Sequence, residues 1–283
     1  MKERLARFVT MVKLQHALFA LPFTLASMLM AQKGMVSLEK FFWIVIAFMS
    51  ARTLGMGMNR LVDRKIDSKN PRTAHRIMAS GRLSVLEVVP LLMLSSAILA
   101  YSAWELDPLC LKLLPVCLFF LLVYPYTKRF TFLAHTFLGV VLALGPIGSW
   151  AAIQGELGWT PLCLGLSILL WVNGFDVIYA VQDEEFDREN GLHSIPVLLG
   201  KKNALLFSRL VHAFVPFFWV ATGVLEAYSG LYFFGTAILS FLLIWEHVAV
   251  AKGYKGNLAL AFFKLNSTIS VGYFFIILVE IFL

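Results

Sequence analysis

The sequence predicts an all-α integral membrane protein that forms a single transmembrane domain over residues 1–283. The first observation is composition: 59% of the residues are hydrophobic and only 14% are charged, with a mean hydropathy of +0.79, whereas soluble domains carry about 25% charged residues. The second is that long apolar runs recur along the whole chain. The third is an uneven distribution of Lys and Arg between the connections.

Nine apolar segments come close to the ~20 residues that a helix needs to cross a ~30 Å hydrocarbon layer. We expect the first to be a retained span rather than a signal peptide, because no clear small-residue cleavage site comes after it. An odd number of spans places the two ends of the chain on opposite sides. The predicted spans are Val12–Ala31, Phe41–Met58, Val85–Ala103, Leu109–Tyr124, Phe132–Ile153, Pro161–Val181, Ala204–Leu225, Tyr232–Ala251 and Phe262–Leu283.

Basic residues give the orientation of these spans. Nineteen Lys and Arg residues lie in the N-terminal segment and alternate connections, against three in the opposite ones. Because cytoplasmic loops are enriched in Lys and Arg, we expect the N-terminus in the cytoplasm and a multi-pass protein of the cytoplasmic (inner) membrane. The net charge of +7 mostly reflects this bias. We therefore expect the lipid bilayer to be a partner of the protein, and we expect no nucleic-acid partner. No sequence feature specifies an oligomeric state.

A first acidic cluster comes directly after the second predicted span. Asn59, Asp63 and Asp67 are spaced by four residues, which places them on one face of a helix. Carboxylates stacked at this spacing repel each other by some tenths of a kcal/mol per exposed pair. A bound cation would remove that cost.

A second cluster, "DVIYAVQDEEFD", lies at the end of the sixth predicted span and contains Asp176, Asp183 and Asp187. Offsets of seven and four again predict one face, on a helix that continues the span into the cytoplasm. Oxygen ligands without His or Cys favour a hard ion such as Mg²⁺, which commonly joins a few carboxylates to substrate phosphates. The alternative is a positive-inside loop whose acids merely balance its bases. The basic residues suited to phosphate oxygens are Arg64, Lys65, Arg72, Arg76 and Lys128.

Four motifs together, "NRLVDRKID", "NPRTAHR", "YPYTKR" and "DVIYAVQDEEFD", resemble in order and spacing the UbiA superfamily of intramembrane prenyltransferases. Their form is similar to the bacterial 4-hydroxybenzoate polyprenyltransferase-like branch. Two positions depart from the pattern. Arg60 stands where many members have the first Asp of the first motif, and Tyr179 stands where the second motif can open with one.

The resemblance implies a central cavity that opens sideways to lipid and is capped on the cytoplasmic side by the two motifs. It implies Mg²⁺-dependent transfer of a polyprenyl group from its diphosphate to an aromatic acid in quinone biosynthesis. Asp176 would stabilise the allylic cation or the ring hydroxyl, with helix packing as the alternative. Arg72, Arg76 and Lys128 would take phosphate charge, and Tyr124, Tyr179 and Lys128 would contact substrate. The implied metal ligands are Asn59, Asp63, Asp67, Asp183 and Asp187.

Arg52 lies in the second predicted span, seven residues before Asn59 and on nearly the same face. A charged Arg within a span costs at least ~2.5 kcal/mol on insertion scales unless it is paired or hydrated. We therefore expect Arg52 to point into the cavity and to hold the carboxylate of the aromatic acid. The alternative is a standing salt bridge to Asp176.

The sequence alone does not exclude other functions. The acceptor could be a menaquinone-pathway (futalosine-type) aromatic acid. Membrane CDP-alcohol phosphotransferases also use spaced aspartates, but within one block of sequence. A transporter would carry its acids near the bilayer midplane. His135, His212 and His247 have no metal-ligand spacing, so we expect them to form hydrogen bonds between helices.

Overall fold

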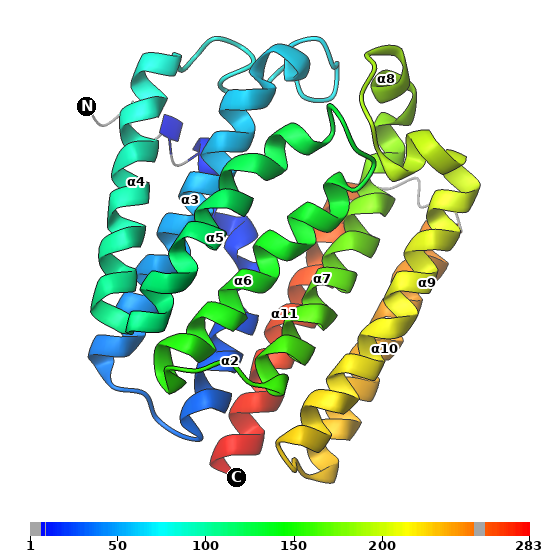
Figure 1. Cartoon of the computed structure of the whole chain (residues 1–283). Coiled ribbons are helices and arrows are strands. Elements are labelled where there is room, and N and C mark those ends of the chain that lie inside the picture. The colour runs from blue at the N-terminus through cyan, green and yellow to red at the C-terminus, as the bar shows by residue number, and fades with distance from the viewer. Residues whose placement is uncertain (1–6, 9, 252–257) are drawn as a thin grey trace.

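The computed structural model is a bundle of long helices (Figure 1) and describes residues 7–8, 10–251 and 258–283. No strand occurs among these residues. The elements are η1 (Leu14–Phe19), α2 (Leu21–Gln32), α3 (Leu38–Asp67), α4 (Val85–Leu106), α5 (Pro108–Thr127), α6 (Ala134–Gln154), α7 (Trp159–Ala180), η2 (Val181–Asp183), α8 (Glu184–Glu189), α9 (Ile195–Leu225), α10 (Gly230–Ala251) and α11 (Leu258–Phe282).

The all-helical membrane fold is confirmed. Eight helices in the described part of the chain are long and apolar enough to cross a membrane. The segments Thr10–Phe19 and Leu21–Gln32 are bent by 45° and give a ninth span if they are taken together, so the count of nine stays a prediction. The described helices differ from the predicted bounds by a few residues, and the largest departures are at two of them. The helix α3 continues to Asp67, and α9 begins at Ile195 but is interrupted at Gly200, which has φ 73° and ψ 159°.

Side-chain caps fix the starts of several helices. Ser84 and Glu87 form a capping box at α4, in which each side chain accepts from the other residue's backbone N–H. The Asp107 carboxylate accepts from the backbone N–H of Leu109 at 2.8 Å at the start of α5. The Ser194 hydroxyl likewise accepts from a backbone N–H at the start of α9. These caps satisfy backbone donors that a helix start otherwise leaves unpaired.

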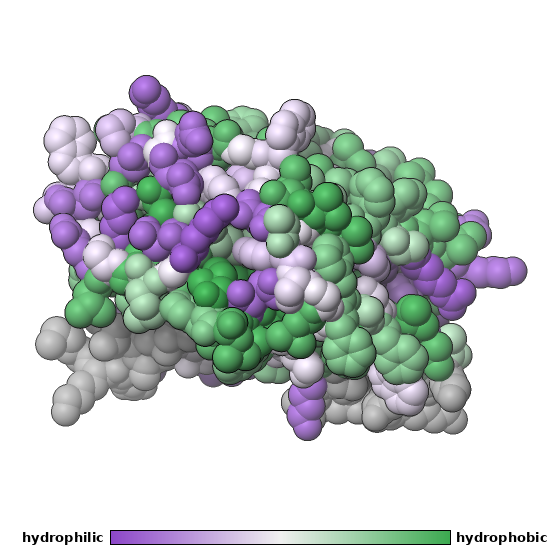
Figure 2. All heavy atoms as spheres, turned by 90° about the horizontal axis from the view of Figure 1, so that it is seen from below, coloured by the Kyte–Doolittle hydropathy of each residue, from purple (hydrophilic) through white to green (hydrophobic). Residues whose placement is uncertain are grey.

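Two clusters of buried apolar side chains hold the bundle together. The first surrounds Trp171 and Trp219 and joins α2, α6 and α7 to α9, α10 and α11. The second surrounds Leu54 and Leu92 and joins α3, α4 and α5. In the end-on view from below, hydrophilic side chains gather toward the left of the face and hydrophobic side chains cover most of the rest of it (Figure 2). In Figure 1, α8 and the connection after α3 lie at the upper end, opposite the end of α11.

The close approach of α6 to α7 gives a test of this packing. A Cβ atom at Gly139 would lie 2.6 Å from the carbonyl oxygen of Leu169, whereas one at Gly148 on the same helix would have no heavy atom within 4 Å. We expect Gly139→Ala to lower the melting temperature by several degrees, because backbone cannot move aside easily and overpacking costs about 1–3 kcal/mol. Gly148→Ala should leave it unchanged or raise it. Equal melting temperatures for the two variants would contradict this packing.

Candidate functional site

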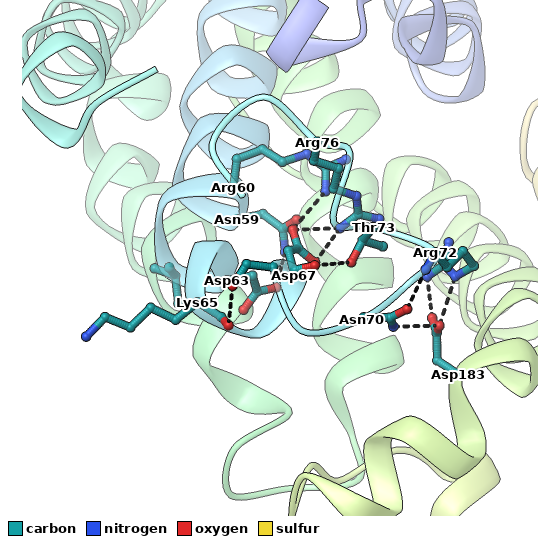
Figure 3. A network of polar contacts seen from close by, with 12 residues as sticks. Asn59, Arg60, Asp63, Lys65, Asp67, Asn70, Arg72, Thr73, Arg76 and Asp183 are labelled. Carbon is teal, nitrogen blue, oxygen red and sulfur yellow. Dashed lines mark hydrogen bonds and ion pairs between the residues drawn. The ribbon is translucent and has the colours of Figure 1, made fainter. Parts of the chain in front are cut away.

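The first acidic cluster occupies the last turns of α3, as predicted (Figure 3). The Asn59 side-chain amide donates to Asp63 Oδ2 at 3.3 Å. Asp63 and Asp67 are 2% and 5% exposed. Carboxylates this deeply buried need charged or hydrogen-bonding partners, and the neighbouring segments supply them.

Asp63 is held by the segment at the end of α5. Lys128 Nζ lies 2.6 Å from Asp63 Oδ2, and Arg129 Nη2 lies 3.0 Å from Asp63 Oδ1. Arg129 Nη2 also donates to the carbonyl of Val62 at 3.1 Å. The "YPYTKR" motif therefore positions two cations against the first acidic motif.

Asp67 is held by the connection that comes after its own helix. Arg76 Nη1 donates to both carboxylate oxygens at 2.7 and 2.9 Å, and Arg60 Nη1 lies 3.8 Å from Asp67 Oδ2. The Thr73 hydroxyl donates to the Asp67 carbonyl at 3.0 Å. The connection thus folds back over the end of α3 (Figure 3).

The helical segment Trp159–Glu189 continues the sixth predicted span as expected, but a 3₁₀ turn interrupts it, which corrects the prediction of one regular helix face. Asp176 lies in α7, Asp183 in the 3₁₀ turn η2 and Asp187 in α8. The physical reason is the run Asp183-Glu184-Glu185, because acidic residues favour the first turn of a new helix, where they face the positive end of its dipole. A 3₁₀ turn also has ~3.0 residues per turn, so it changes the rotation between Asp176 and the next helix from that of a regular α-helix.

Asp183 is joined to the connection after α3. Arg72 donates to it through Nε at 2.8 Å and through Nη2, and the Asn70 amide donates at 3.0 Å. Arg72 Nη1 also donates to the Tyr179 hydroxyl at 2.7 Å, and its guanidinium lies 4.9 Å from that ring's centroid. Burial alone would lower the pKa of Arg72, but the hydrogen bonds and charge of Asp183 raise it above its ordinary value. The connection after α3 therefore links the two acidic motifs.

The residues fit Mg²⁺ by their donor chemistry rather than as a complete cage. In the described part of the chain, no three His, Cys, Asp or Glu side chains converge as a metal site, so an ion bound here would need substrate phosphate oxygens to complete its coordination. Mg²⁺ is typically held by one or two carboxylates together with substrate phosphates, and the Asn59–Asp63 pair and Asp183 each offer such oxygen ligands.

Two of the bases predicted for phosphate do not join this network, and four residues without a predicted role do. Arg64 donates to the carbonyl of Leu61, and Lys65 is exposed and points away from the acids (Figure 3). The additional members are Arg129 and Asn70, together with Arg60 and Thr73 beside Asp67. Arg129 is the neighbour of Lys128, and Asn70 belongs to "NPRTAHR", so both lie inside the quoted motifs.

Asp176 pairs with a histidine rather than with Arg52, so the alternative salt bridge is wrong. His135 Nδ1 lies 2.7 Å from Asp176 Oδ2. Arg52 Nη2 instead donates to the carbonyl of Lys13 at 3.2 Å. His212 and His247 contact each other at 3.0 Å across α9 and α10, so the three histidines form hydrogen bonds between helices, as predicted.

An apolar cavity of about 230 Å³ lies among α2 to α6. Arg52 and Tyr124 line it, and the Tyr124 hydroxyl donates to the carbonyl of Gly55 at 2.9 Å. Gly55 is about one helical turn before Asn59 on α3. From Met56 to Ile44 on the same helix, the cavity wall covers a rise of about 18 Å at ~1.5 Å per residue. The cavity is therefore long and apolar, with polar groups near the end that carries the acidic motifs.

The protein is a helical membrane bundle, and its apolar cavity lies beside paired carboxylates and cations. These features define a class of membrane-embedded proteins that can bind an amphiphile by both its apolar tail and its charged end. The model of the UbiA prenyltransferase family matches residues 20–268. The chain belongs to this family of enzymes that transfer prenyl groups. That membership separates it from the CDP-alcohol phosphotransferases and from transporters.

Relatives and solved structures agree with the family. The chain is 30% identical over 240 residues to the 4-hydroxybenzoate octaprenyltransferase of Shewanella woodyi, covering 82% of this chain and 84% of that one. It is 30% identical over 187 residues to the enzyme of that name from Vibrio campbellii, covering 66% of each. The apo structure of a UbiA homolog from Aeropyrum pernix K1 has a TM-score of 0.85 at 32% identity, covering 94% of this chain and 98% of that one. A UbiA homolog from Archaeoglobus fulgidus, bound to DMAPP and Mg²⁺, shares the fold, with a TM-score of 0.73 at 17% identity, covering 96% and 99%.

Proposed function

We propose that the protein transfers a polyprenyl group from polyprenyl diphosphate to an aromatic acid similar to 4-hydroxybenzoate, with release of diphosphate. The observation that carries this proposal is the apolar cavity, which reaches Tyr124 and Gly55 about one turn from the first acidic motif and Arg52 about two turns from it. The names of the bacterial relatives support the acceptor class. The A. fulgidus homolog with DMAPP and Mg²⁺ supports the donor and the ion.

The charged end of the donor would lie between the two motifs. Arg72, Arg76 and Lys128 each contact a motif carboxylate, so a diphosphate bound there would meet all three. Mg²⁺, when bound, would supply further positive charge at the diphosphate oxygens. The residues proposed to hold it are Asn59, Asp63, Asp67, Asp183 and Asp187.

The reaction breaks the allylic C–O bond and leaves its electron pair on the diphosphate. Cations aimed at that leaving group stabilise the transition state more than the ground state, and so lower the barrier. The aromatic ring then attacks the allylic carbon, and once the C–C bond has formed the same ring carbon loses its proton to the released diphosphate or to water, which restores the aromatic ring. Asp176, whose side chain is 27% exposed and is held by His135, is proposed to stabilise the developing cation or the ring hydroxyl. The apolar cavity limits quenching by water.

An in vitro panel tests the proposal. Purified protein is supplied with one prenyl diphosphate and Mg²⁺, and with either 4-hydroxybenzoate or a futalosine-type aromatic acid. Prenylated product is measured by mass spectrometry and diphosphate is measured separately. We expect product and diphosphate in equal amounts, and loss of both when EDTA removes the ion. Diphosphate release without a prenylated acid in any reaction would contradict the proposed acceptor class.

The far end of the cavity is proposed to hold the end of the prenyl tail. Gly148 lines the cavity, and a side chain there would meet open space. Gly148→Phe should therefore lower kcat/KM for a long polyprenyl diphosphate by about tenfold, ~1.4 kcal/mol, and affect a short prenyl diphosphate little. Competition between donors of different length measures the ratio. The matched Gly148→Ala variant should keep the wild-type preference, and an equal loss for long and short donors would exclude this placement of the tail.

We also propose that the two motifs face the cytoplasm. The connection after α3 is rich in Lys and Arg, and cytoplasmic loops are enriched in these residues. A reporter inserted near Gly81 should therefore be cytoplasmic, and one fused after Leu283 should be periplasmic. Reporters on the same side would show an even number of spans.

A further inference from the structure

A second groove lies between α9 and α10, and it is separate from the cavity among α2 to α6. It has a volume of about 570 Å³ and shares no lining residue with that cavity. Its walls combine a small polar end with an apolar stretch. The residues that define it here are Arg209, His212, Pro216, Leu243, Ile244 and His247.

The polar end of the groove lies on α9, a candidate membrane span, among exposed apolar side chains. Arg209 is exposed, and its neighbours Leu206, Leu210 and Phe214 are 50%, 56% and 60% exposed. In the described part of the chain, Arg209 forms no ion pair or side-chain hydrogen bond. A cation among lipid-facing side chains is costly unless it is paired, so a partner from outside the chain would stabilise it.

The histidines beside Arg209 form a hydrogen-bonded pair with a defined direction. His212 Nε2 lies 2.9 Å from the carbonyl of Trp171, and since a carbonyl only accepts, this nitrogen carries the hydrogen. A neutral His212 then accepts at Nδ1, so His247 Nε2, 3.0 Å away, donates. A neutral His247 is left with a lone pair on Nδ1. A ligand hydroxyl could donate to it at the groove wall.

Glu246, a carboxylate near these histidines, is turned away from the groove. It is 2% exposed and accepts from the Asn266 amide at 2.8 Å, toward α11. It lies 3.9 Å from His212 and does not line the groove. An anion beside Arg209 would therefore not face this acid. Basic pockets between spanning helices are known sites for anionic lipid head groups.

We propose that this groove binds an anionic phospholipid whose head group carries hydroxyl groups, of the phosphatidylglycerol type. Its phosphate pairs with Arg209, a head-group hydroxyl donates to His247 Nδ1, and an acyl chain lies along Pro216, Leu243 and Ile244. Each part of such a lipid has its own partner in the groove. The charge of Arg209 selects the phosphate, the free acceptor on His247 selects the hydroxyl, and the apolar remainder of the groove selects the acyl chain.

The bound lipid would also support the helix that carries the second motif. His212 and Ser208 both donate to backbone carbonyls of α7, Ser208 at 2.7 Å from the carbonyl of Gly174. Gly174 lies two residues before Asp176, and a Cβ atom there would meet the His212 ring at 2.2 Å. The groove wall and α7 are therefore in direct contact, and we expect the lipid to raise thermal stability.

Native mass spectrometry of the delipidated protein tests the proposal, with three lipids titrated in turn: phosphatidylglycerol, phosphatidic acid and phosphatidylcholine. Wild-type protein should bind phosphatidylglycerol about tenfold more tightly than phosphatidylcholine and should melt at a higher temperature with it. Arg209→Gln should remove the preference over phosphatidylcholine. The wild-type protein should also prefer phosphatidylglycerol to phosphatidic acid, which has no glycerol hydroxyl to donate to His247 Nδ1, and His247→Phe should remove that preference. Lys202→Gln, which removes an exposed cation of α9 outside the groove, should behave as wild type.

Three results would overturn the site. Equal affinity for all three lipids in the wild-type protein would show nonspecific association. An unchanged preference in both Arg209→Gln and His247→Phe would place the lipid elsewhere. Displacement of phosphatidylglycerol by farnesyl diphosphate at equal concentration would assign the groove to a prenyl diphosphate. Melting curves of each variant without added lipid separate a folding defect from lost binding, because Arg209 is exposed and its loss should leave that melting temperature unchanged.

Discussion

Replacing Asp63 or Asp183 with Asn is expected to reduce prenyl transfer by at least about 10³-fold, which corresponds to ~4 kcal/mol in barrier. Each substitution keeps the size of the side chain and removes a negative charge at the proposed diphosphate site. Asp63 pairs with Lys128 and Arg129, and Asp183 pairs with Arg72. Loss of either carboxylate removes a proposed ion ligand and releases the cations from their positions. Turnover in a coupled diphosphate-release assay measures the effect.

Glu185→Gln is the matched control for this experiment. Glu185 is an exposed carboxylate in the same segment as Asp183, so its neutralisation changes the net charge equally. We expect activity within about twofold of wild type. Removing one partner of a buried ion pair can also cost several kcal/mol of stability, so melting temperature and membrane accumulation are measured alongside. Folded Asp63→Asn and Asp183→Asn proteins that retain activity within tenfold of wild type would exclude the metal–diphosphate assignment.

The local features of the first motif could be predicted from the sequence because they depend on one helix. Asn59, Asp63 and Asp67 share a face of α3 as their spacing indicates. The second motif could not be placed in the same way. Offsets of seven and four describe one face only if the helix is uninterrupted, and η2 interrupts it at Val181–Asp183. The acidic run that favours a new helix start is visible in the sequence, but it competes with helix continuation.

Contacts between distant segments were beyond what spacing can predict. Arg129 meets Asp63 because the ends of α3 and α5 lie together, and Asn70 meets Asp183 because the connection after α3 crosses to η2. His135 takes the position beside Asp176 that Arg52 was considered for. In each case the pattern indicated residue types suited to charge pairing, and the tertiary arrangement decided which pairs form.

Arg52→Ala is expected to raise the KM for the aromatic acid by about 100-fold, ~2.7 kcal/mol, and to leave the KM for prenyl diphosphate nearly unchanged. Arg52 lines the cavity beside Tyr124. Its Nη2 donates to the carbonyl of Lys13, and its Nε is buried without a hydrogen-bond partner in the described part of the chain. A guanidinium can bind a carboxylate through two parallel N–H groups. Such a contact would satisfy Nε and fix the ring beside the allylic carbon.

Arg52→Lys separates a directed contact from simple attraction between charges. An ammonium keeps the charge but cannot make the forked contact, so we expect it to recover only about a tenth of the acceptor affinity that Arg52→Ala loses. Lys112→Ala, which removes an exposed cation at the opposite end of α5, should change neither KM. A rise in the KM for prenyl diphosphate would instead place Arg52 at the diphosphate site. Failure of Arg52→Ala to accumulate in the membrane, with Arg52→Lys fully active, would assign Arg52 to the contact with Lys13 and so to the scaffold.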